Sequence, residues 1–471
     1  MRSGTDVVLA APVAPLAAHP LLVFLTQVTL LLLAALLLGR LARRLGMPAI
    51  VGELSAGVLF GPTVLAHLVP SISDWLFPPE IEQLHLLDAA AQLGVLLLVG
   101  FTGVDLDIGM IRRRGTTVLR ISLAGFLLPL GLGVGLGLLL PADVLSGGED
   151  RATFALFLGV TMCVSAIPVI AKTLSDMRLL HRNIGQLTLG AGMVDDALGW
   201  FMLSVVSAMA TGAVRAHNVA LSLMWLAVVL VGAWLVGRPL VRWILRQATR
   251  GDDAAPAVAA SAIIIVACSA CTHAMGLEAL FGAFVGGVLI GTSGVEVNGR
   301  IAALRTAVFA VLAPLFFATA GLRIDLSALG RPVVLFTGIV VLLTAIVGKF
   351  AGAYIGALTS RLNRWEALAL GAGMNARGVV EVVVAMTGLR LGVLNVASYT
   401  IVVLVAIVTS VMAPPILRYA MARVEHTGEE ELRLRGGLAY AAEQQQQQQQ
   451  QKQRPQEPQQ QLVLPERGDR E

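Results

Sequence analysis

Charged residues are scarce in this chain. They make up 14% of its 471 residues, whereas hydrophobic residues make up 56% and the mean hydropathy is +0.79. An average soluble domain carries about 25% charged residues. The shortage of charge excludes an ordinary water-soluble protein and predicts an all-α polytopic membrane protein, because helices satisfy their own backbone groups within a bilayer.

Cysteine is scarce as well. The chain has an odd number of cysteines, Cys163, Cys268 and Cys271, and the last two lie three positions apart in an apolar stretch. Such a pair could bind a metal or act in redox chemistry, but buried small hydrophobic residues are the simpler interpretation. We therefore expect no cofactor.

Apolar runs of about 17–25 residues predict about thirteen transmembrane helices. The runs begin near Leu21, Ile50, Leu86, Thr117, Thr153, Ile184, Val219, Pro256, Leu277, Ala307, Val333, Glu366 and Ala397. Residues 1–20 lack the basic run and compact apolar core of a signal peptide, so they are expected to form an extracytoplasmic N-terminal segment. Residues 21–421 then form the transmembrane domain.

Lysine and arginine in the short loops predict the orientation. With the N-terminus outside, the cytoplasmic loops hold roughly three times as many basic residues as the loops on the other side. This bias favours a multi-pass protein of the cell membrane with a cytoplasmic C-terminus. The net charge of +4 follows from this topology and from contact with membrane lipid, so nucleic acid need not be a partner.

The composition changes near the end of the chain. A glutamine tract runs from Gln444 to Gln451, and prolines and further glutamines follow it. Such a segment cannot bury enough apolar surface to fold. We expect residues 422–471 to form a disordered, glutamine-rich cytoplasmic tail without a folded regulatory domain.

Two adjacent carboxylates, Asp195 and Asp196, interrupt the apolar stretch from Leu187 to Met209. A charge at mid-bilayer depth costs several kcal/mol, which makes such a pair a candidate ion or proton site. The side chains point about 100° apart on a helix, so they can share a cavity while having different partners. The alternative is that the carboxylates cap neighbouring helices.

A second candidate region contains Thr161, Ser165 and Pro168. Pro168 has no amide hydrogen and clashes with the preceding turn, so it should free a carbonyl oxygen and interrupt the helix. Freed carbonyls and the two hydroxyls are oxygen donors that suit an alkali cation. A simple proline kink that binds nothing is the alternative.

Lys349 lies well inside another apolar run. A buried lysine needs a carboxylate partner, and Asp195 and Asp196 are the candidates. Alternatively, the lysine side chain reaches the membrane interface, where its ammonium group stays hydrated.

Residues 374–381 combine an ion pair with a possible break. Arg377 and Glu381 are four apart and can pair along one helix face, which would make them a structural element. Asn375 and Gly378 favour a helix interruption. Interrupted segments in both halves of a membrane domain indicate an inverted-repeat transporter, here with helices two to six and nine to thirteen as five-helix repeats. This pairing places Lys349 near the aspartates.

In order and spacing, several motifs resemble those of the monovalent cation:proton antiporter-2 family, within the cation:proton antiporter superfamily. The motifs are VGELSAG (51–57), GPTVL (61–65), GVDLD (103–107), SAIPV (165–169), LFGAF (280–284), GLRIDL (321–326) and MNARG (374–378). The resemblance extends from about Leu21 to Met421. It implies a sodium/proton antiporter fold and exchange of sodium or potassium for protons; the motifs do not settle which cation.

The resemblance also implies roles for individual residues. Asp196 would be the main cation and proton carboxylate, and Asp195 would pair with Lys349 and exchange that partner during the cycle. Thr161 and Ser165 would lie near the ion. Apart from the resemblance, we predict that Arg377 and Glu381, from their spacing, and Glu53 of the first motif are structural charges. Two acids with a membrane lysine imply electrogenic exchange, and the family frequently forms homodimers that work by an elevator-like motion.

Other classes of protein stay open at this point. A proton-regulated cation channel or uniporter would use similar polar residues, and a transport-dead sensor would also retain them. An intramembrane aspartyl protease needs aspartates opposed from different helices, which the adjacent Asp195 and Asp196 do not easily provide. We therefore expect a secondary transporter and not an enzyme.

Overall fold

The computed structural model describes a helical protein. The described residues are 17–78, 81–105, 115–141, 151–165, 182–211, 227–251, 253–295 and 299–425, with shorter stretches at 170, 174, 177, 179, 224–225, 297, 427–428 and 430–431. The chain divides into two compact units, residues 1–180 with 184–424 and residues 181–183 with 425–471. The first unit contains the membrane helices.

The elements of the first half are α1 (Ala18–Arg44), α2 (Ala49–Phe60), α3 (Leu65–Leu68), α4 (Pro70–Leu76), α5 (Ile81–Val104), α7 (Gly115–Leu139), α8 (Arg151–Cys163) and α10 (Asn183–Thr211). Those of the second half are η2 (Ala233–Gly237), α12 (Arg238–Ala248), α13 (Ala255–Ala274), α14 (Ala279–Gly291), α15 (Ala302–Ala307), η3 (Val308–Leu312), α16 (Ala313–Gly321), η4 (Leu326–Gly330), α17 (Pro332–Thr359), α18 (Arg364–Met374), α19 (Val379–Arg390) and α20 (Val396–Met421).

Ten helical stretches of the described chain are long and apolar enough to cross a membrane. The helices α8 and α14 are apolar but shorter. The protein is therefore a multi-pass, all-helical membrane protein, as the composition predicts. The predicted count of thirteen crossings is not confirmed by these ten, and the start predicted near Val219 lies outside the described residues.

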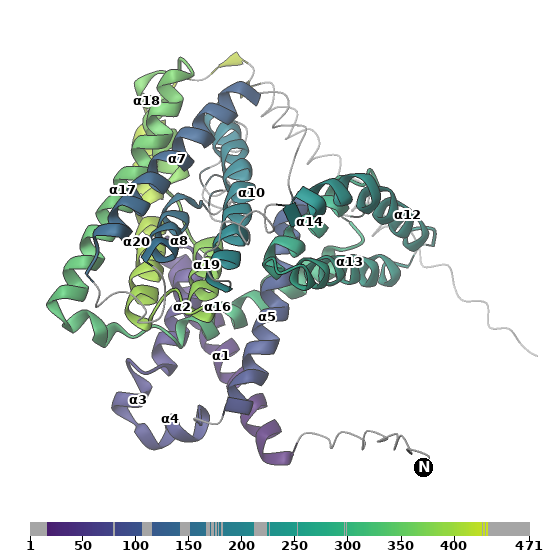
Figure 1. Ribbon diagram of the computed structural model, residues 1–471, viewed down its shortest axis with the longest axis vertical. Coiled ribbons are helices and arrows are strands. Elements are labelled where there is room, and N and C mark those ends of the chain that lie inside the picture. Colours follow the sequence, from purple (N-terminus) through teal and green to yellow (C-terminus); the bar gives the residue numbers. More distant parts are fainter. Residues whose placement is uncertain are drawn as a thin grey trace, which may run out of the picture. The chain divides into compact units, whose positions relative to one another are not determined.

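The helices of the first unit pack in two sets (Figure 1). In one set, α7 packs along α17 and against α8, α18 packs against α17 and α20, and α19 packs against α20. In the other set, α1 packs on α2, α2 on α16, α5 on α14 and α13 on α14. We call the first set the site bundle and the second the flanking bundle; α16 and α19 are in contact between them.

Glycines mark two crossings of the flanking bundle. A Cβ atom on Gly57 of α2 would lie 2.0 Å from the carbonyl oxygen of Ala318 in α16, and one on Gly287 of α14 would lie 1.9 Å from that of Gly100 in α5. Both positions therefore require glycine for close backbone approach. Under the predicted repeat, α2 corresponds to α14 and α5 to α16, so the two crossings are equivalent. This reciprocity supports the inverted-repeat interpretation.

The second unit includes the first residues of the predicted tail. Arg182 forms an ion pair with Glu430 at 3.0 Å, and the amide of Asn183 donates to the same carboxylate at 2.6 Å. These described positions are therefore held by specific contacts. Residues 1–16 and 432–471 lie outside the described residues, so the predicted N-terminal segment and disordered tail stay predictions.

Candidate ion-binding site

Asp195 lies at the centre of a buried network on α10. Its Oδ1 atom accepts a hydrogen bond from Ser122 of α7 at 2.5 Å. Its Oδ2 atom lies 2.5 Å from the ammonium nitrogen of Lys349, and both side chains of this pair have an exposed fraction of 0%. The predicted meeting of Lys349 with the aspartate pair is thus present, and the lysine does not extend to the membrane interface.

A close helix crossing brings these groups together. A Cβ atom on Gly352 of α17 would lie 2.4 Å from the carbonyl oxygen of Ala124 in α7, and one on Gly348 would lie 3.1 Å from Pro129. These two glycines flank Lys349, so α7 and α17 can pack with their backbones in near contact. Ser122 belongs to the same stretch of α7, and for that reason it reaches Asp195.

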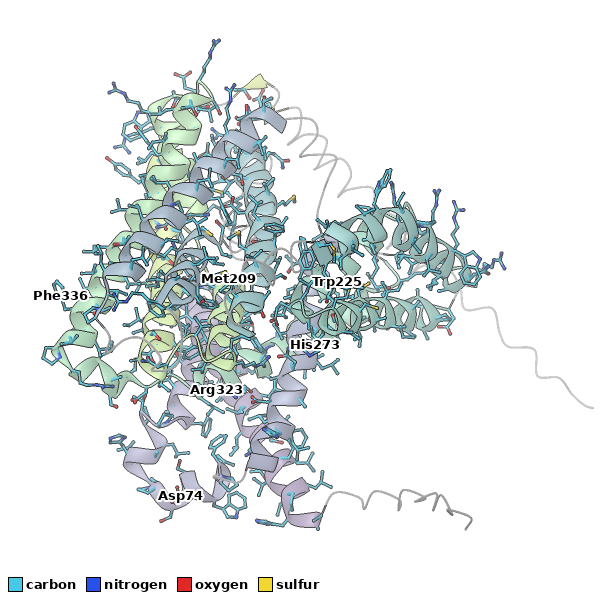
Figure 2. All side chains as sticks on the ribbon, in the orientation of Figure 1. Asp74, Met209, Trp225, His273, Arg323 and Phe336 are labelled. Carbon is cyan, nitrogen blue, oxygen red and sulfur yellow. The ribbon has the colours of Figure 1, made fainter. Side chains whose placement is uncertain are left out.

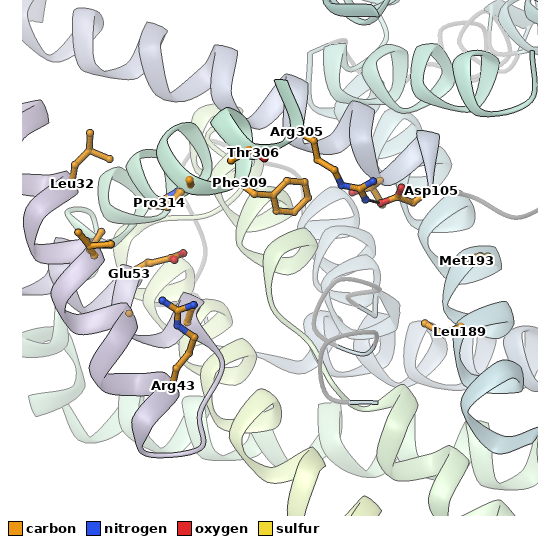
Figure 3. Close-up of a pocket in the computed structure, with 16 residues that line it drawn as sticks. Leu32, Arg43, Glu53, Asp105, Leu189, Met193, Arg305, Thr306, Phe309 and Pro314 are labelled. Carbon is orange, nitrogen blue, oxygen red and sulfur yellow. Dashed lines mark hydrogen bonds and ion pairs between the residues drawn. The ribbon is translucent and has the colours of Figure 1, made fainter. Parts of the chain in front are cut away.

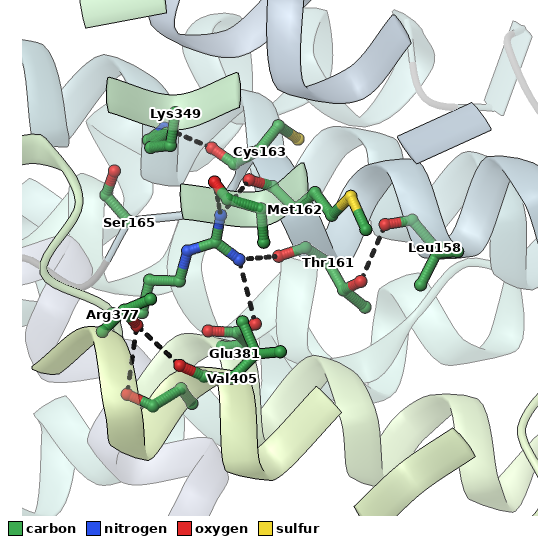
Figure 4. A network of polar contacts seen from close by, with 12 residues as sticks. Leu158, Thr161, Met162, Cys163, Ser165, Lys349, Arg377, Glu381 and Val405 are labelled. Atoms are coloured by element: carbon green, nitrogen blue, oxygen red, sulfur yellow. Dashed lines mark hydrogen bonds and ion pairs between the residues drawn. The ribbon is translucent and has the colours of Figure 1, made fainter. Parts of the chain in front are cut away.

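Helix α8 ends at Cys163, a few residues before the position predicted for the interruption, which lies outside the described residues. Two cations cap this helix end (Figure 4). The last carbonyls of a helix lack intrahelical donors and form the negative end of its dipole. Lys349 donates to the carbonyl of Cys163. Arg377 donates to the carbonyls of Thr161, at 3.2 Å, and Met162, at 2.6 Å. The two buried cations therefore stabilise a helix end inside the bundle.

The second interruption lies between α18 and α19. Asn375 follows the last residue of α18, and Gly378 precedes the first residue of α19. Between them, Arg377 pairs with Glu381 at 3.1 Å, as the spacing predicts, and also donates to the carbonyl of Ala345 at 3.0 Å. Arg377 therefore connects α8, α17 and α19, a role that the sequence did not indicate.

Ser165 joins the two interruptions. Its hydroxyl lies 3.2 Å from Oδ2 of Asp195 and 3.0 Å from the carbonyl oxygen of Met374. A hydroxyl has one hydrogen, so it donates fully to one of these acceptors at a time. Thr161 differs, since its hydroxyl donates back to the carbonyl of Leu158 at 2.7 Å. Pro168, the third predicted residue of this region, lies outside the described residues.

The side chains of Asp196 and Asn375 are buried, and their polar atoms have no hydrogen-bond partner among the described residues. Both residues have an exposed fraction of 0%. Neither carboxylate oxygen of Asp196, and neither polar atom of the Asn375 amide, has a hydrogen-bond partner among the described residues. Unpaired buried polar atoms are rare and costly, and an ionised carboxylate is the most costly of them. Asp196 therefore needs a proton or a cation, which Asp195 does not.

The buried charges of the described membrane helices do not cancel. Three of these residues are acids and two are bases: Asp195, Asp196, Glu381, Lys349 and Arg377. When all five are ionised, one negative charge is left over. A single proton or monovalent cation would balance it. A divalent metal would leave an excess positive charge in a low-dielectric site, which is unfavourable.

A cavity of about 860 Å³ opens at one end of the first unit (Figure 3). Glu53, predicted as a structural charge, lies on its wall together with Arg43, and Asp105 pairs there with Arg305. Met193 of α10, one turn before Asp196, also lines it. We call this side of the unit the cavity end. The cavity thus reaches the helix that carries both aspartates.

Two interrupted helices that meet around buried charges are the architecture of a secondary transporter with repeated halves. The comparison with protein families agrees, because residues 29–422 match the model described as sodium/hydrogen exchanger, transmembrane. The chain belongs to this family.

Individual relatives agree with the family. Cation/H(+) antiporter 18 of Arabidopsis thaliana is 30% identical over 396 residues, which are 83% of this chain and 48% of the relative. The chain thus spans about half the length of this plant relative. Na(+)/H(+) antiporter NhaS4 of Synechocystis is 28% identical over 403 residues, covering 85% of this chain and 97% of the relative.

A solved structure has the same fold. The sodium proton antiporter MjNhaP1 from Methanocaldococcus jannaschii superimposes with a TM-score of 0.62, covering 85% of this chain and 99% of that chain. At 17% sequence identity this likeness concerns the fold alone. The predicted sodium/proton antiporter fold is confirmed.

Proposed function

We propose that this protein is a secondary active antiporter that exchanges sodium or potassium for protons at Asp196 and Asp195. The observation that carries the proposal is the contrast between the two carboxylates. Asp195 has three donors, Ser122, Lys349 and Ser165, whereas Asp196 has no partner among the described residues. The names of the relatives support the same exchange.

Coupling follows from competition for Asp196. A proton and an alkali cation cannot both satisfy this carboxylate, so loading of one favours release of the other. If the site opens alternately to the two sides of the membrane, the two fluxes are coupled. The elevator-like motion, in which the site bundle moves against the flanking bundle, is part of this proposal.

Lys349 gives Asp195 its proposed switching role. While the lysine contacts Asp195, the aspartate stays charged without binding an ion. When a cation draws Asp195 toward Asp196, Lys349 loses its carboxylate and retains the Cys163 carbonyl. The protons then belong to the cluster as a whole and not to one residue. Because both acids and the lysine take part, we propose electrogenic exchange.

Asn375 is a further candidate ligand. Its amide oxygen is buried and has no partner among the described residues. The preceding carbonyl of Met374 lies 3.0 Å from the Ser165 hydroxyl that also contacts Asp195. An amide oxygen is a neutral donor suited to an alkali cation but not needed by a proton. We propose that Asn375 helps the site to hold the cation.

The test is flux in reconstituted vesicles. Antiport predicts that an imposed proton gradient drives uptake of sodium or potassium, with lithium and rubidium as comparison ions. Cation uptake that does not depend on the proton gradient indicates the second candidate, a cation channel or uniporter. With the membrane potential clamped, net charge movement distinguishes electrogenic from electroneutral exchange.

We also propose that the protein forms a homodimer in the cell membrane, with its N-terminus outside.

A further inference from the structure

One face of α10 carries Leu189, Met193, Asp196, Trp200 and Ser207. At 100° per residue, these positions fall within about 60° of one another around the helix. Leu189 and Met193 line the cavity, so this face of α10 turns toward the flanking bundle at the cavity end. Continuing along the face beyond Asp196 leads toward the opposite end of the unit.

Polar groups continue along this face. Trp200, one turn beyond Asp196, is fully buried, and its indole nitrogen has no hydrogen-bond partner among the described residues. Ser204 is buried one turn further on. Ser207 then donates to the carboxylate of Glu278 at 3.2 Å. From Asp196 to Ser207 the helix advances about 16 Å. The stretch therefore links two carboxylates.

Glu278 stands at the far end of this stretch, immediately before α14 of the flanking bundle, and is half-buried. The charged groups near it are Arg390, at the end of α19, and His273, at the end of α13 (Figure 2). Arg390 also interacts with Asp88 and Arg323, which pair with each other at 2.6 Å. Among the described residues Glu278 forms no ion pair, and Arg390 and His273 act on it at longer range.

We propose that Glu278 is a second carboxylate of the exchange path, which takes up the cation or proton that passes between Asp196 and this end of the protein. In the conformation described, the Trp200 side chain closes the path between the two carboxylates. A carboxylate at the mouth of a narrow path raises the local cation concentration. The buried indole N–H offers a hydrogen bond to a water molecule that accompanies the ion. This inference rests on the proposed antiport.

The first test measures transport from each end separately. In vesicles with a uniform protein orientation, Glu278→Gln should raise the half-saturating cation concentration about tenfold when cation is supplied at the Glu278 end. It should leave the value at the cavity end unchanged. The matched control is Asp74→Asn, which removes an exposed acid of α4. An equal change from both ends, or no difference from the control, overturns the proposal.

The second test does not depend on transport. Cys268 and Cys271 are replaced by serine, fully buried Cys163 is kept, and Ser204→Cys serves as the reporter. Because Ser204 lies on the Glu278 side of Trp200, a membrane-impermeant thiol reagent is added at the cavity end, and Trp200→Ala should increase modification of the reporter about tenfold. Unchanged modification from the cavity end contradicts a closing role for Trp200.

Two controls complete the labelling test. Trp200→Phe keeps an aromatic ring in the same place, so the path should stay closed. Trp243→Ala removes an indole that is 60% exposed on α12, and it should not change the labelling. If wild-type protein exchanges ions normally while Glu278→Gln behaves like its control, this inference fails and the proposed function stands. If wild-type protein shows no proton-coupled exchange, the proposed function itself fails.

Discussion

Lys349 connects a helix end to a carboxylate. Its ammonium group donates both to the carbonyl of Cys163, where α8 ends, and to Oδ2 of Asp195 on α10. One cation thus neutralises the negative end of a helix dipole and a buried aspartate together. A change in the charge of Asp195 therefore alters the support of the α8 interruption, which couples ion binding to the geometry of the site.

Removing the lysine charge should destabilise the protein through Asp195. Lys349→Gln leaves a buried carboxylate without its counter-charge, which costs about 3–5 kcal/mol. The melting temperature in detergent should fall, and Asp195→Asn in the same chain should restore much of it. Purely additive effects of the two substitutions contradict the proposed pairing. In vesicles, Lys349→Gln should also reduce the charge moved per cycle.

Arg377 should tolerate no replacement by lysine. A guanidinium can donate to the Thr161, Met162 and Ala345 carbonyls and to Glu381 at once, whereas an ammonium group has three donors and a different shape. Arg377→Lys should lower the stability by about 2–5 kcal/mol, as measured by thermal unfolding. The control is Arg331→Gln, an exposed arginine before α17. A loss no larger than that of the control contradicts the capping role.

Replacing Asn375 should weaken cation binding without lowering the stability of the protein. Truncating a buried, hydrogen-bonded amide usually destabilises a protein, but the Asn375 amide has no partner among the described residues to lose. Asn375→Ala should therefore change the melting temperature little while raising the half-saturating cation concentration about tenfold, the loss of roughly 1.4 kcal/mol of binding. Strong destabilisation with unchanged cation affinity would show that the amide has a structural partner instead.

The second unit should loosen in acid. Burial alone would raise the pKa of Glu430, but the backbone amides of Asn183 and Thr427 and the charge of Arg182 outweigh it, and the pKa lies below the ordinary 4.5. A lowered pKa in the folded state gives a contribution to stability that is full above 4.5 and is lost as the pH falls through the folded value. Hydrogen exchange at Asn183 and Thr427, corrected for the intrinsic pH effect, should accelerate in that range. In the Glu430→Gln variant, the amides of Asn183 and Thr427 should exchange rapidly at every pH.

The sequence predicted those residues of the site that place a charge in an apolar helix, because burying such a charge is energetically costly. Asp195, Asp196 and Lys349 stand out for that reason, and the spacing of Arg377 and Glu381 indicates their pairing. Ser122 gave no such signal, because a serine in a membrane helix can satisfy its hydroxyl on its own backbone. Only the close crossing of α7 and α17 shows that it contacts Asp195.

Other features depend on the folded structure and not on the local sequence. The capping of α8 by Arg377 requires knowing that the helix stops at Cys163, and sequence patterns place helix ends poorly. That the Asn375 amide has no partner in the described part of the chain is a property of the packed bundle, since any asparagine in a sequence could find a partner. The number of membrane crossings also depends on short and interrupted helices that hydropathy alone does not resolve.

The most direct test of the central claim compares Asp196→Asn with wild type and Asp195→Asn. Vesicles with an imposed proton gradient report cation uptake, and thermal unfolding verifies that each variant is folded. We predict that Asp196→Asn retains its melting temperature and loses proton-coupled exchange, because an amide neither exchanges a proton nor balances a cation. Asp195→Asn should retain exchange with less charge moved per cycle. Proton-coupled cation uptake by folded Asp196→Asn at the wild-type rate would contradict the account.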